Sequence, residues 1–408
     1  AYDPAYGGFG HAPKFPPSSG LRLLLRAHAH SSEPRCLELA RGTLDGMLRG
    51  GMFDHVGGGF ARYSTDEQWH VPHFEKMLYD NAQLARVYLE AFQVTRDSEY
   101  RRVAVETLDY VTRELQAPNG GFYSATDADS EGVEGKFFTF TLAELAQVLD
   151  QPLLRSFAAY YDVSEAGNWE GTNVLRTPRS LAQVAAELGL EQAALSQQLA
   201  EARTRVYAAR AQRVAPLLDD KVLVSWNALM IGALAEGARV LGRSDYARAA
   251  ERAADYLLSA LRRPDGGLYR TARADQAHLP AYLEDYAFLG DALIDLYESG
   301  ADERYLQAAD ALCTRMLEDF RDPEGGGFFQ TAHQHEALIA RPRDGQDDAL
   351  PNANAVAAQL CARLSYHYDR PALREVAQRT IACFGQIVQR APRAFASMLA
   401  VVDFLREG

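Results

Sequence analysis

The chain has 408 residues, of which 47% are hydrophobic and 24% are charged, so it has ample apolar material for a large core. Its formal net charge of -13 repels nucleic acid and anionic membranes, and no apolar run approaches the roughly 20 residues that span a bilayer. We therefore expect neither nucleic acid nor a membrane among its partners. Because the chain begins with Ala1 and has no secretory signal segment, we expect a piece of a longer, cytoplasmic protein.

Helical periodicity dominates the chain. Apolar residues recur with helical spacing over 18–30, 34–49, 73–95, 98–117, 192–212, 221–242, 244–262, 280–299, 302–320, 350–368, 371–390 and 392–406. Short connections that contain Gly, Ser or Asp join these segments in pairs, as in TRDSE (95–99), LGRSD (241–245) and SGADE (299–303). The pattern predicts a series of helical hairpins.

The longer connections between pairs resemble one another. Each has a Gly-Gly turn, then an aromatic residue or Leu, then a short extended piece: HVGGGFARYS (55–64), PNGGFYSA (118–125), PDGGLYRTA (264–272) and PEGGGFFQTA (323–332). The interval between the second and third connections is about twice the other two, which predicts an insertion. Within it, 121–141 alternates like a β-hairpin around a Gly-rich acidic turn, and 142–190 mixes short helices and loops.

A hairpin repeat of this kind cannot bury its apolar face alone, so neighbouring hairpins must stack. We predict an all-α fold, an (α/α)6 toroid in which inner helices surround a central cavity. It would form a single domain over 1–408, with the insertion at 121–190 inside it. The alternative is an open α-solenoid, whose repeats are usually shorter and lack the long Gly-Gly connectors.

Polar and aromatic residues concentrate where the first helix of each pair begins. These stretches are GGFGHAPKFPPSS (7–19), QWHVPHFEKMLYD (68–80), LLDDKVLVSWNAL (217–229), HLPAYLEDYAF (278–288) and RPRDGQDDALPNANA (341–355). The second helices begin with ordinary sequences such as SDYARAAERAA (244–254). If the first helices are the inner ones, their N-termini and these clusters converge on one rim of the cavity. Helix N-termini favour oxygen-rich, anionic or hydroxyl groups.

The stretch from Trp69 to Asp80 is the densest of these clusters. On a helix, His73, Lys76 and Asp80 share one face, and His70 lies one turn ahead. Imidazoles near a helix N-terminus favour the neutral form, which suits proton abstraction. The catalytic candidates are therefore His70, His73, Glu75, Asp80, Glu284 and Asp285.

Residues that would bind the ligand come from the same stretches. All three tryptophans lie in or beside polar segments, and aromatic faces beside carboxylates and amides are typical of a carbohydrate site. The binding candidates are His11, Lys14, Trp69, Lys76, Tyr79, Asp127, Asp129, Trp169, Asp220, Lys221, Trp226, Asn227, Tyr286, Arg341, Asn352 and Asn354.

Sequence motifs for metal sites, disulfides and nucleotide binding are weak or missing. The pairs HAH (28–30) and HQH (333–335) lack a third ligand at a recognisable spacing, and DADSEG (127–132) lacks the last glutamate of a calcium loop. The four cysteines stand singly, which favours reduced thiols. No phosphate-binding glycine motif is present. We predict no metal and no cofactor.

Several motifs together resemble the helical part of the spermatogenesis-associated, thioredoxin-domain-containing protein family. They are YGGFGHAPKFP (6–16), GGGFARYSTDEQWHVPHFEKMLYDNAQL (57–84), GFYSATDADSEG (121–132), DDKVLVSWNALMI (219–231), LEDYAF (283–288) and DPEGGGFFQT (322–331). The resemblance implies a barrel like those of six-hairpin glycosidases and N-acylglucosamine 2-epimerases. In that family a thioredoxin-like domain normally precedes the helical part. No such motif occurs in this chain, so we expect the domain to be separate or missing.

Three functions fit these observations. The first is a sugar epimerase or isomerase in which His73 and His70 transfer a proton, Glu75, Asp80 and Glu284 orient them, and Trp69 and Trp226 stack on the ligand. The second is a six-hairpin glycoside hydrolase with two carboxylates, for which no pair is singled out among Asp127, Asp129, Asp219, Asp220, Glu284, Asp285 and Asp347. The third is a non-catalytic module that binds a ligand or another protein.

Overall fold

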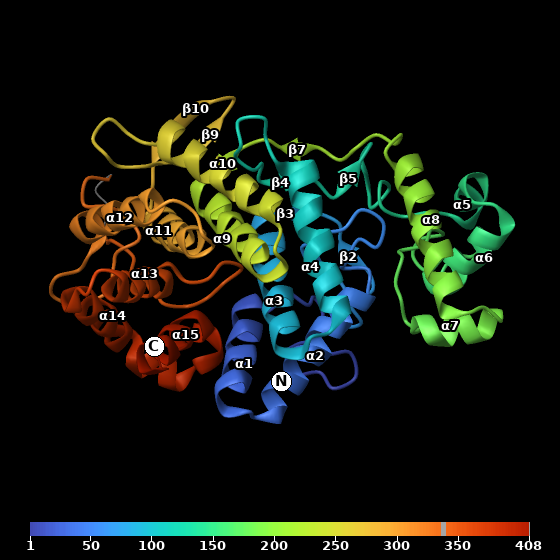
Figure 1. Cartoon of the computed structure of the whole chain (residues 1–408), viewed down its shortest axis with the longest axis horizontal. Helices are drawn as coiled ribbons and strands as arrows, with labels where there is room; N and C mark the ends of the chain where they lie inside the picture. Colours follow the sequence, from blue (N-terminus) through green and yellow to red (C-terminus); the bar gives the residue numbers. More distant parts are fainter. Residues whose placement is uncertain (336–339, 408) are drawn as a thin grey trace. The chain divides into compact units, whose positions relative to one another are not determined.

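The computed structural model describes residues 1–335 and 340–407 (Figure 1). The chain divides into two compact units. The first unit consists of Ala1–Pro17, Leu37–Asn81 and Ala125–Asp219. The second unit consists of Ser18–Cys36, Ala82–Ser124 and the described residues from Asp220 onward.

Helices buried on most of their surface form the centre of the second unit. Val224–Leu241 is apolar on nearly every face, as a core helix must be. Such helices alternate along the chain with amphipathic ones. They are α3 (Leu78–Thr95, whose first turn belongs to the first unit), α9 (Val224–Leu241), α11 (Leu283–Glu298) and α13 (Ala353–His367). Together with α1 (Ser18–Ser31) and α15 (Ala396–Glu407), which are buried on one face only, we call them the inner helices.

The helices that follow them are amphipathic. In α10 the buried residues Tyr246, Ala249, Ala253 and Leu257 recur at helical spacing and leave the other face to solvent. The outer helices are α4 (Ser98–Tyr110, continued by the π-helical turn η1, Val111–Leu115), α10 (Ser244–Ala260), α12 (Arg304–Phe320) and α14 (Pro371–Arg390), which leads into the 3-10 turn η2 (Pro392–Phe395).

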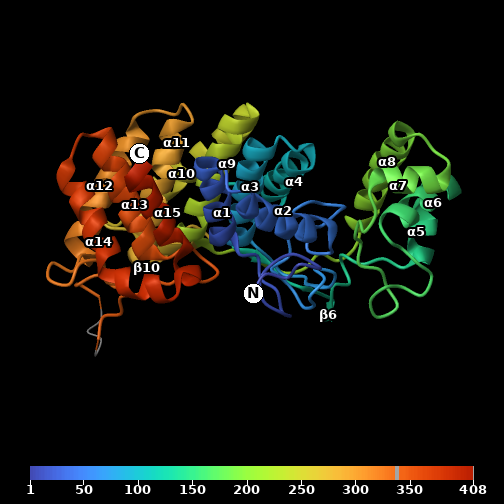
Figure 2. The same cartoon turned by 90° about the horizontal axis from the view of Figure 1, so that it is seen from below.

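Hairpin pairing is as the sequence predicts. Helix α9 packs on α10, α11 on α12, and α13 on α14, while α9, α11 and α13 are consecutive neighbours. Helix α15 contacts both α13 and α1, and Figure 2 shows these three helices together. None of the described helices combines the length and the apolar character that crossing a bilayer requires.

Short strands precede several inner helices. In the second unit, β8 (Val222–Leu223), β9 (Tyr269–Arg273) and β10 (Gln276–Pro280) form an antiparallel sheet in the order β10-β9-β8. In the first unit, β1 (Tyr63–Ser64) pairs with β2 (Pro72–His73), β3 (Lys76–Met77) pairs with β4 (Ala125–Thr126), and β4 pairs with β7 (Leu218–Asp219).

The predicted β-hairpin of the insertion is confirmed over Asp129–Glu134. There β5 (Asp129–Ser130) pairs with β6 (Val133–Glu134). Glu131 and Gly132 between them have φ of 53° and 74°, the positive values that a tight two-residue hairpin turn requires.

The helices of the insertion pack around a buried apolar cluster, which Val56 also joins. Leu145, Phe157, Val184 and Leu199 belong to one buried cluster. They come from α5 (Leu142–Val148), α6 (Gln151–Tyr160), α7 (Leu181–Leu188) and α8 (Gln192–Arg210). Helix α8, which we had counted among the hairpin helices, thus packs with the insertion, so the expected boundary at residue 190 is too early.

Helix boundaries at the polar clusters also differ from the prediction. The helix expected from residue 73 begins at Leu78, because His73 pairs with Tyr63 and Lys76 pairs with Thr126 in short strands. The predicted single helical face of His73, Lys76 and Asp80 is therefore wrong. Extended residues point alternately to opposite sides, and their backbone groups bond to the neighbouring strands instead.

Candidate functional site

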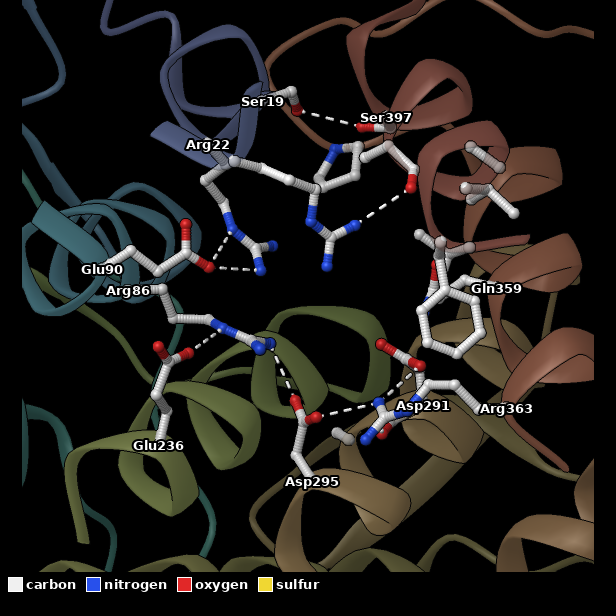
Figure 3. Close-up of a pocket in the computed structure, with 18 of the residues that line it drawn as sticks. Ser19, Arg22, Arg86, Glu90, Glu236, Asp291, Asp295, Gln359, Arg363 and Ser397 are labelled. Atoms are coloured by element: carbon white, nitrogen blue, oxygen red, sulfur yellow. Dashed lines mark hydrogen bonds and ion pairs between the residues drawn. The ribbon is translucent and has the colours of Figure 1, made fainter. Parts of the chain in front are cut away.

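A cavity of about 780 Å³ lies inside the second unit (Figure 3). Each of the six inner helices contributes to its wall. Ser19, Gln83 and Ser397 line it near the N-termini of their helices, whereas His30 and His367 line it near the C-termini. The cavity therefore extends along the length of the inner helices.

Two arginines of the cavity wall form ion pairs with three of its carboxylates. Arg86 of α3 lies 2.9 Å from Glu236 and 2.8 Å from Asp295. Arg363 of α13 lies 2.8 Å from a second oxygen of Asp295 and 2.8 Å from Asp291. Asp295 thus bridges two guanidinium groups, as Figure 3 shows, and the network joins α3, α9, α11 and α13.

Burial and ion pairing compete in setting the charges of this network. Burial raises the pKa of Glu236 and of Asp291, although each lies beside an arginine. For Asp295, burial opposes ionisation, but Arg86 and Arg363 together outweigh it and lower the pKa. A charge buried between two opposite charges keeps its ionised form, so Asp295 is the stable centre of the network.

The wall formed by α1 and α15 carries a second polar group. Arg22 lies 2.7 Å from Glu90, and Arg26 donates to the carbonyl oxygen of Ala400 at 3.0 Å. His30 Nδ1 lies 3.1 Å from Asp403. The Ser19 and Ser397 hydroxyls are 3.1 Å apart, so α1 and α15 close this side of the cavity through side-chain contacts.

These cavity residues were not among the predicted site residues, although the sequence contains a signal for them. Glu236 and Arg363 stand within otherwise apolar inner helices, and Asp291 and Asp295 occupy one face of another. Since a buried charge needs an opposite charge, such residues predict contacts between inner helices.

The predicted site residues of the second unit do not line the cavity. Asn227 and Asn354 are fully buried and each holds a Gly-Gly connector: their side-chain oxygens accept the N–H of Phe122 and of Phe328, both at 2.7 Å. Asn81, in the first unit, does the same for Phe60 at 2.7 Å. In the connector that contains Leu268, a tyrosine replaces the asparagine: the Tyr286 hydroxyl accepts the N–H of Leu268 at 2.8 Å.

Each of these amides also donates to the carbonyl of the same connector residue, Phe122 at 2.9 Å and Phe328 at 3.0 Å. Asn227, Asn354 and Tyr286 thus satisfy the backbone after each Gly-Gly turn. Their predicted place in a ligand site is corrected: they bind the connectors because a buried loop must satisfy its backbone groups.

The other predicted residues of α13 and its connector serve the backbone as well. Asn352 caps α13 by accepting the N–H of Asn354 at 2.8 Å. Arg341 lies over the Phe329 ring and donates to the carbonyl oxygen of Thr331 at 3.2 Å.

Around the start of α11, the acidic pair is divided between two environments. Asp285 is fully buried and accepts the N–H groups of Ser225 at 3.1 Å and Tyr282 at 2.9 Å. Burial raises its pKa to about 7, against the attraction of Arg270. Glu284 is partly exposed and lies 2.9 Å from Arg270. A carboxyl that is half neutral near pH 7 beside an arginine can exchange a proton.

Asp220, Lys221 and Trp226 lie before and in the first turn of α9. Asp220 pairs with Arg273 at 2.6 Å at an exposed position, Lys221 is exposed, and Trp226 is half-buried. Their role in binding stays a prediction.

In the first unit, four predicted residues gather around Arg62. Glu75 lies 3.0 Å from Arg62 and 3.8 Å from His73, whose other ring nitrogen lies 2.7 Å from Glu134. Tyr79 and Asp80 are buried beside them, and burial raises the pKa of Tyr79 to about 12 and that of Asp80 well above its usual value. The cluster combines a carboxyl whose neutral form is favoured by burial with an imidazole that lies against two carboxylates.

His70 does not join this cluster through a described contact. Its Nε2 is buried without a hydrogen bond among the described residues, and burial together with Arg176 lowers its pKa. The neutral state expected for His70 therefore agrees with its surroundings, but the physical cause is burial rather than a helix N-terminus.

Lys14, Trp69 and Lys76 are structural in this unit. Lys14 donates to Asp3 at 2.5 Å and to two backbone carbonyls, and Lys76 pairs with Asp54 at 2.8 Å. The Trp69 ring is fully buried, with Nε1 donating to the carbonyl of Tyr6 at 3.1 Å. Its predicted role in stacking on a ligand is wrong for this conformation, because no face of the ring reaches solvent.

The remaining candidates of the first unit lie at or near its surface. His11 is largely exposed and lies 3.2 Å from Glu67, and Trp169 packs half-buried against Phe74. Asp129 is exposed on the insertion hairpin, and Asp127 is exposed just before it. Among the described residues, no group of three or more His, Cys, Asp or Glu side chains is arranged to hold a metal ion, and the four cysteines are free thiols.

Comparison with known proteins agrees with the sequence resemblance. No family model matches the chain. Spermatogenesis-associated protein 20 is 37% identical in Mus musculus and in Homo sapiens, over 98% of this chain and 56% of each relative. An uncharacterized protein of Caenorhabditis elegans is 31% identical over 98% of this chain and 59% of its own length. The resemblance is confirmed, and the chain spans little more than half the length of these relatives.

Solved structures establish the fold. A D-mannose isomerase superposes with a TM-score of 0.60 at 11% identity, covering 94% of this chain and 80% of that one. The GH76 α-mannanase of Bacteroides thetaiotaomicron superposes with a TM-score of 0.52 at 12% identity, covering 90% and 73%. The predicted (α/α)6 fold, like that of six-hairpin glycosidases, is thereby confirmed.

Proposed function

We propose that this homologue of spermatogenesis-associated protein 20 binds a sugar or sugar derivative in the cavity of the inner helices and acts on it by proton transfer, as an isomerase or epimerase. The observation that carries the proposal is the cavity itself. Its volume of about 780 Å³ lies within the range of pockets that enclose small ligands. Its wall combines hydroxyl, amide, carboxylate and guanidinium groups with aliphatic and aromatic side chains.

Sugar hydroxyls would find both donors and acceptors on this wall. Gln359, Ser19 and Ser397 provide neutral polar groups, and Glu90 provides a carboxylate (Figure 3). Phe288, Tyr366 and Phe404 also line the cavity and offer rings to the C–H faces of a sugar.

Two histidines of the cavity wall are suited to carry the proton. His30 Nδ1 lies 3.1 Å from Asp403, and His367 Nε2 lies 3.1 Å from Glu298. Each carboxylate fixes the orientation of its imidazole and leaves the second ring nitrogen without a hydrogen bond to any described residue. His70 and His73 of the first unit stay predictions for the same chemistry.

The first experiment measures thermal unfolding of the chain with neutral, acidic, amino and N-acetylated sugars. A ligand present at about 100 times its dissociation constant stabilises the folded state by about 2.7 kcal/mol. We expect one class of sugar to raise the unfolding midpoint. A panel without any effect would contradict the proposal.

Turnover is tested with the bound sugar in D₂O, where proton transfer beside a carbonyl exchanges the carbon-bound hydrogen for deuterium. We expect exchange with the wild-type chain and its loss in His367→Gln or His30→Gln. His28→Gln is the matched control, because His28 contacts the carbonyl of Glu33 at 3.0 Å and does not line the cavity. Release of reducing sugar from glycosides without exchange would assign hydrolysis instead.

A non-catalytic binding module is the second candidate. The ion pairs of the cavity favour it, because Arg86 and Arg363 are already paired with carboxylates. A sugar that binds in the cavity and undergoes neither exchange nor cleavage would support this candidate over the isomerase.

A further inference from the structure

The ionised groups of the cavity wall are unevenly paired. All five carboxylates that line the cavity in the described part of the chain lie within 2.9 Å of an arginine: Glu90 of Arg22, Glu236 and Asp295 of Arg86, and Asp291 and Glu298 of Arg363. Three arginines thus account for every carboxylate of the lining. Arg26 and Arg239 remain, and Arg239 lies at an exposed position of α9.

Among the cations of the wall that are not at exposed positions, Arg26 has the weakest contact with a carboxylate. Its Nη1 donates to the carbonyl oxygen of Ala400 at 3.0 Å, and its closest carboxylate, Asp403, lies 3.6 Å from Nε. Asp403 is at the same time 3.1 Å from His30. A guanidinium group has five N–H donors, so most of those of Arg26 have no acceptor among the described residues.

Arg22 lies one helical turn before Arg26 on the same helix and lines the same cavity. Its Nε and Nη2 both contact a single oxygen of Glu90, at 2.8 Å and 2.7 Å, which leaves Nη1 and the second Glu90 oxygen available. Figure 3 shows the guanidinium group of Arg22 directed into the cavity. Two neighbouring guanidinium groups with free donors form a site that suits a planar or tetrahedral anion.

The electrostatic surroundings of Arg26 agree with this geometry. Burial lowers the pKa of Arg26, and the positive charges of Arg22 and Arg86 lower it further, while Glu90 and Asp403 oppose them. The acids that face Arg26 from α3 and α15 offset only part of the combined effect of burial and of the neighbouring arginines. An anion bound between the arginines would offset the rest.

We propose that the ligand of this cavity is an acidic sugar whose carboxylate or phosphate group binds Arg26 together with Arg22. This inference rests on the proposed sugar-binding function and specifies its substrate class. The hydroxyls of the same ligand would contact the free oxygen of Glu90 and the neutral groups of the wall.

The test measures dissociation constants of the full chain for D-glucose, D-glucuronate and D-glucose 6-phosphate by titration calorimetry. Acetate and inorganic phosphate serve as anions without a sugar. We expect at least one acidic sugar to bind about tenfold or more tightly than D-glucose, because a charge-assisted hydrogen bond contributes roughly 1.5–3 kcal/mol. The carboxylate and phosphate arms identify which anion the site accepts.

Variants locate the site. Arg26→Gln should remove the preference for the acidic sugar, and Arg26→Lys should restore part of it, because lysine keeps the charge but not the planar fork. Arg248→Gln is the matched control, since Arg248 lies on the outer helix α10 and contacts Ser244. Unfolding midpoints without ligand report whether each variant folds. Were Arg26→Gln unfolded, the comparison of acidic and neutral sugars in the wild-type chain would still decide.

Each of the other outcomes contradicts one part of the proposal. Equal affinity for D-glucose, or an unchanged preference in a folded Arg26→Gln chain, would refute the acidic ligand and leave sugar binding intact. Acetate or phosphate binding as tightly as the acidic sugars would refute the contribution of the sugar. Binding of no sugar at all would refute both this inference and the proposed function.

Discussion

Asp285 shows how one buried carboxyl links the fold to pH. Its side chain is fully buried, and its oxygens accept two backbone N–H groups at the junction of α9 and α11. Burial raises its pKa in the folded chain to about 7, from an ordinary value of 3.8. The neutral form is therefore the one that the folded state favours.

The raised pKa of Asp285 makes the folded state less stable as the pH rises. A carboxyl whose folded pKa is raised stabilises the fold fully below its unfolded pKa, and the stabilisation is lost as pH rises through the folded value. We expect the free energy of unfolding to fall between pH 4 and pH 8, with Asp285 contributing up to roughly 4 kcal/mol. Urea unfolding across this range measures the slope.

Asp285→Asn should flatten this slope, because asparagine stays neutral and can still accept a hydrogen bond. Asp369→Asn, at an exposed position after α13, is the control and should leave the slope unchanged. An equal slope in Asp285→Asn and in the wild-type chain would show that other groups cause the pH dependence.

At the scale of elements, the repeated contact is an asparagine of an inner helix on a Gly-Gly connector. Asn227 accepts the N–H of Phe122 at 2.7 Å and donates to the carbonyl oxygens of Phe122 and Leu223, both at 2.9 Å. Asn354 makes the equivalent pair of bonds with Phe328. The connectors keep their conformation because their buried backbone groups have these partners.

Asn227→Ala should lower the free energy of unfolding by about 2–4 kcal/mol, since the Phe122 N–H would be left buried without an acceptor. Asn354→Ala should have a similar effect at its own connector. Chemical denaturation measures both, with Gln212→Ala at an exposed turn as control. A loss below about 1 kcal/mol in both variants would mean that water or rearranged side chains replace the amide.

At the scale of the whole chain, α15 completes the wall of the cavity. Met398 and Val401 are buried, and Ser397, Ala400 and Asp403 contact α1 through hydrogen bonds or ion pairs. The last helix therefore closes the ring of inner helices on the side of α1.

A chain that ends at Arg390 should lose roughly 3–6 kcal/mol through the buried Met398 and Val401 side chains. It should also lose binding of any cavity ligand and bind a hydrophobic dye at the uncovered apolar surface. Calorimetry and dye fluorescence measure these effects, with a chain ending at Arg406 as control. Retention of ligand affinity in the shorter chain would place the binding site away from α15.

Most of the architecture could be predicted from local patterns. Helical periodicity, capping residues and the repeated Gly-Gly connectors indicated the hairpins, their pairing and the (α/α)6 fold, because each of these signals acts within a few residues of chain. The insertion was visible as a long interval between connectors. Its end was misplaced because α8 has the periodicity of any amphipathic helix, and only its packing against Leu145 and Phe157 assigns it to the insertion.

The direction of each polar side chain could not be obtained in this way. Asn227, Asn354 and Asp285 stand at helix starts that also suit a ligand site, yet their contacts in the fold are backbone groups of connectors and neighbouring helices. Conversely, Glu236 and Arg363 had no local motif, and their ion pairs with Arg86 and Asp295 depend on the rotation and stagger of four helices. Periodicity specifies which residues must be buried, whereas the packing of the whole chain specifies which buried charges meet.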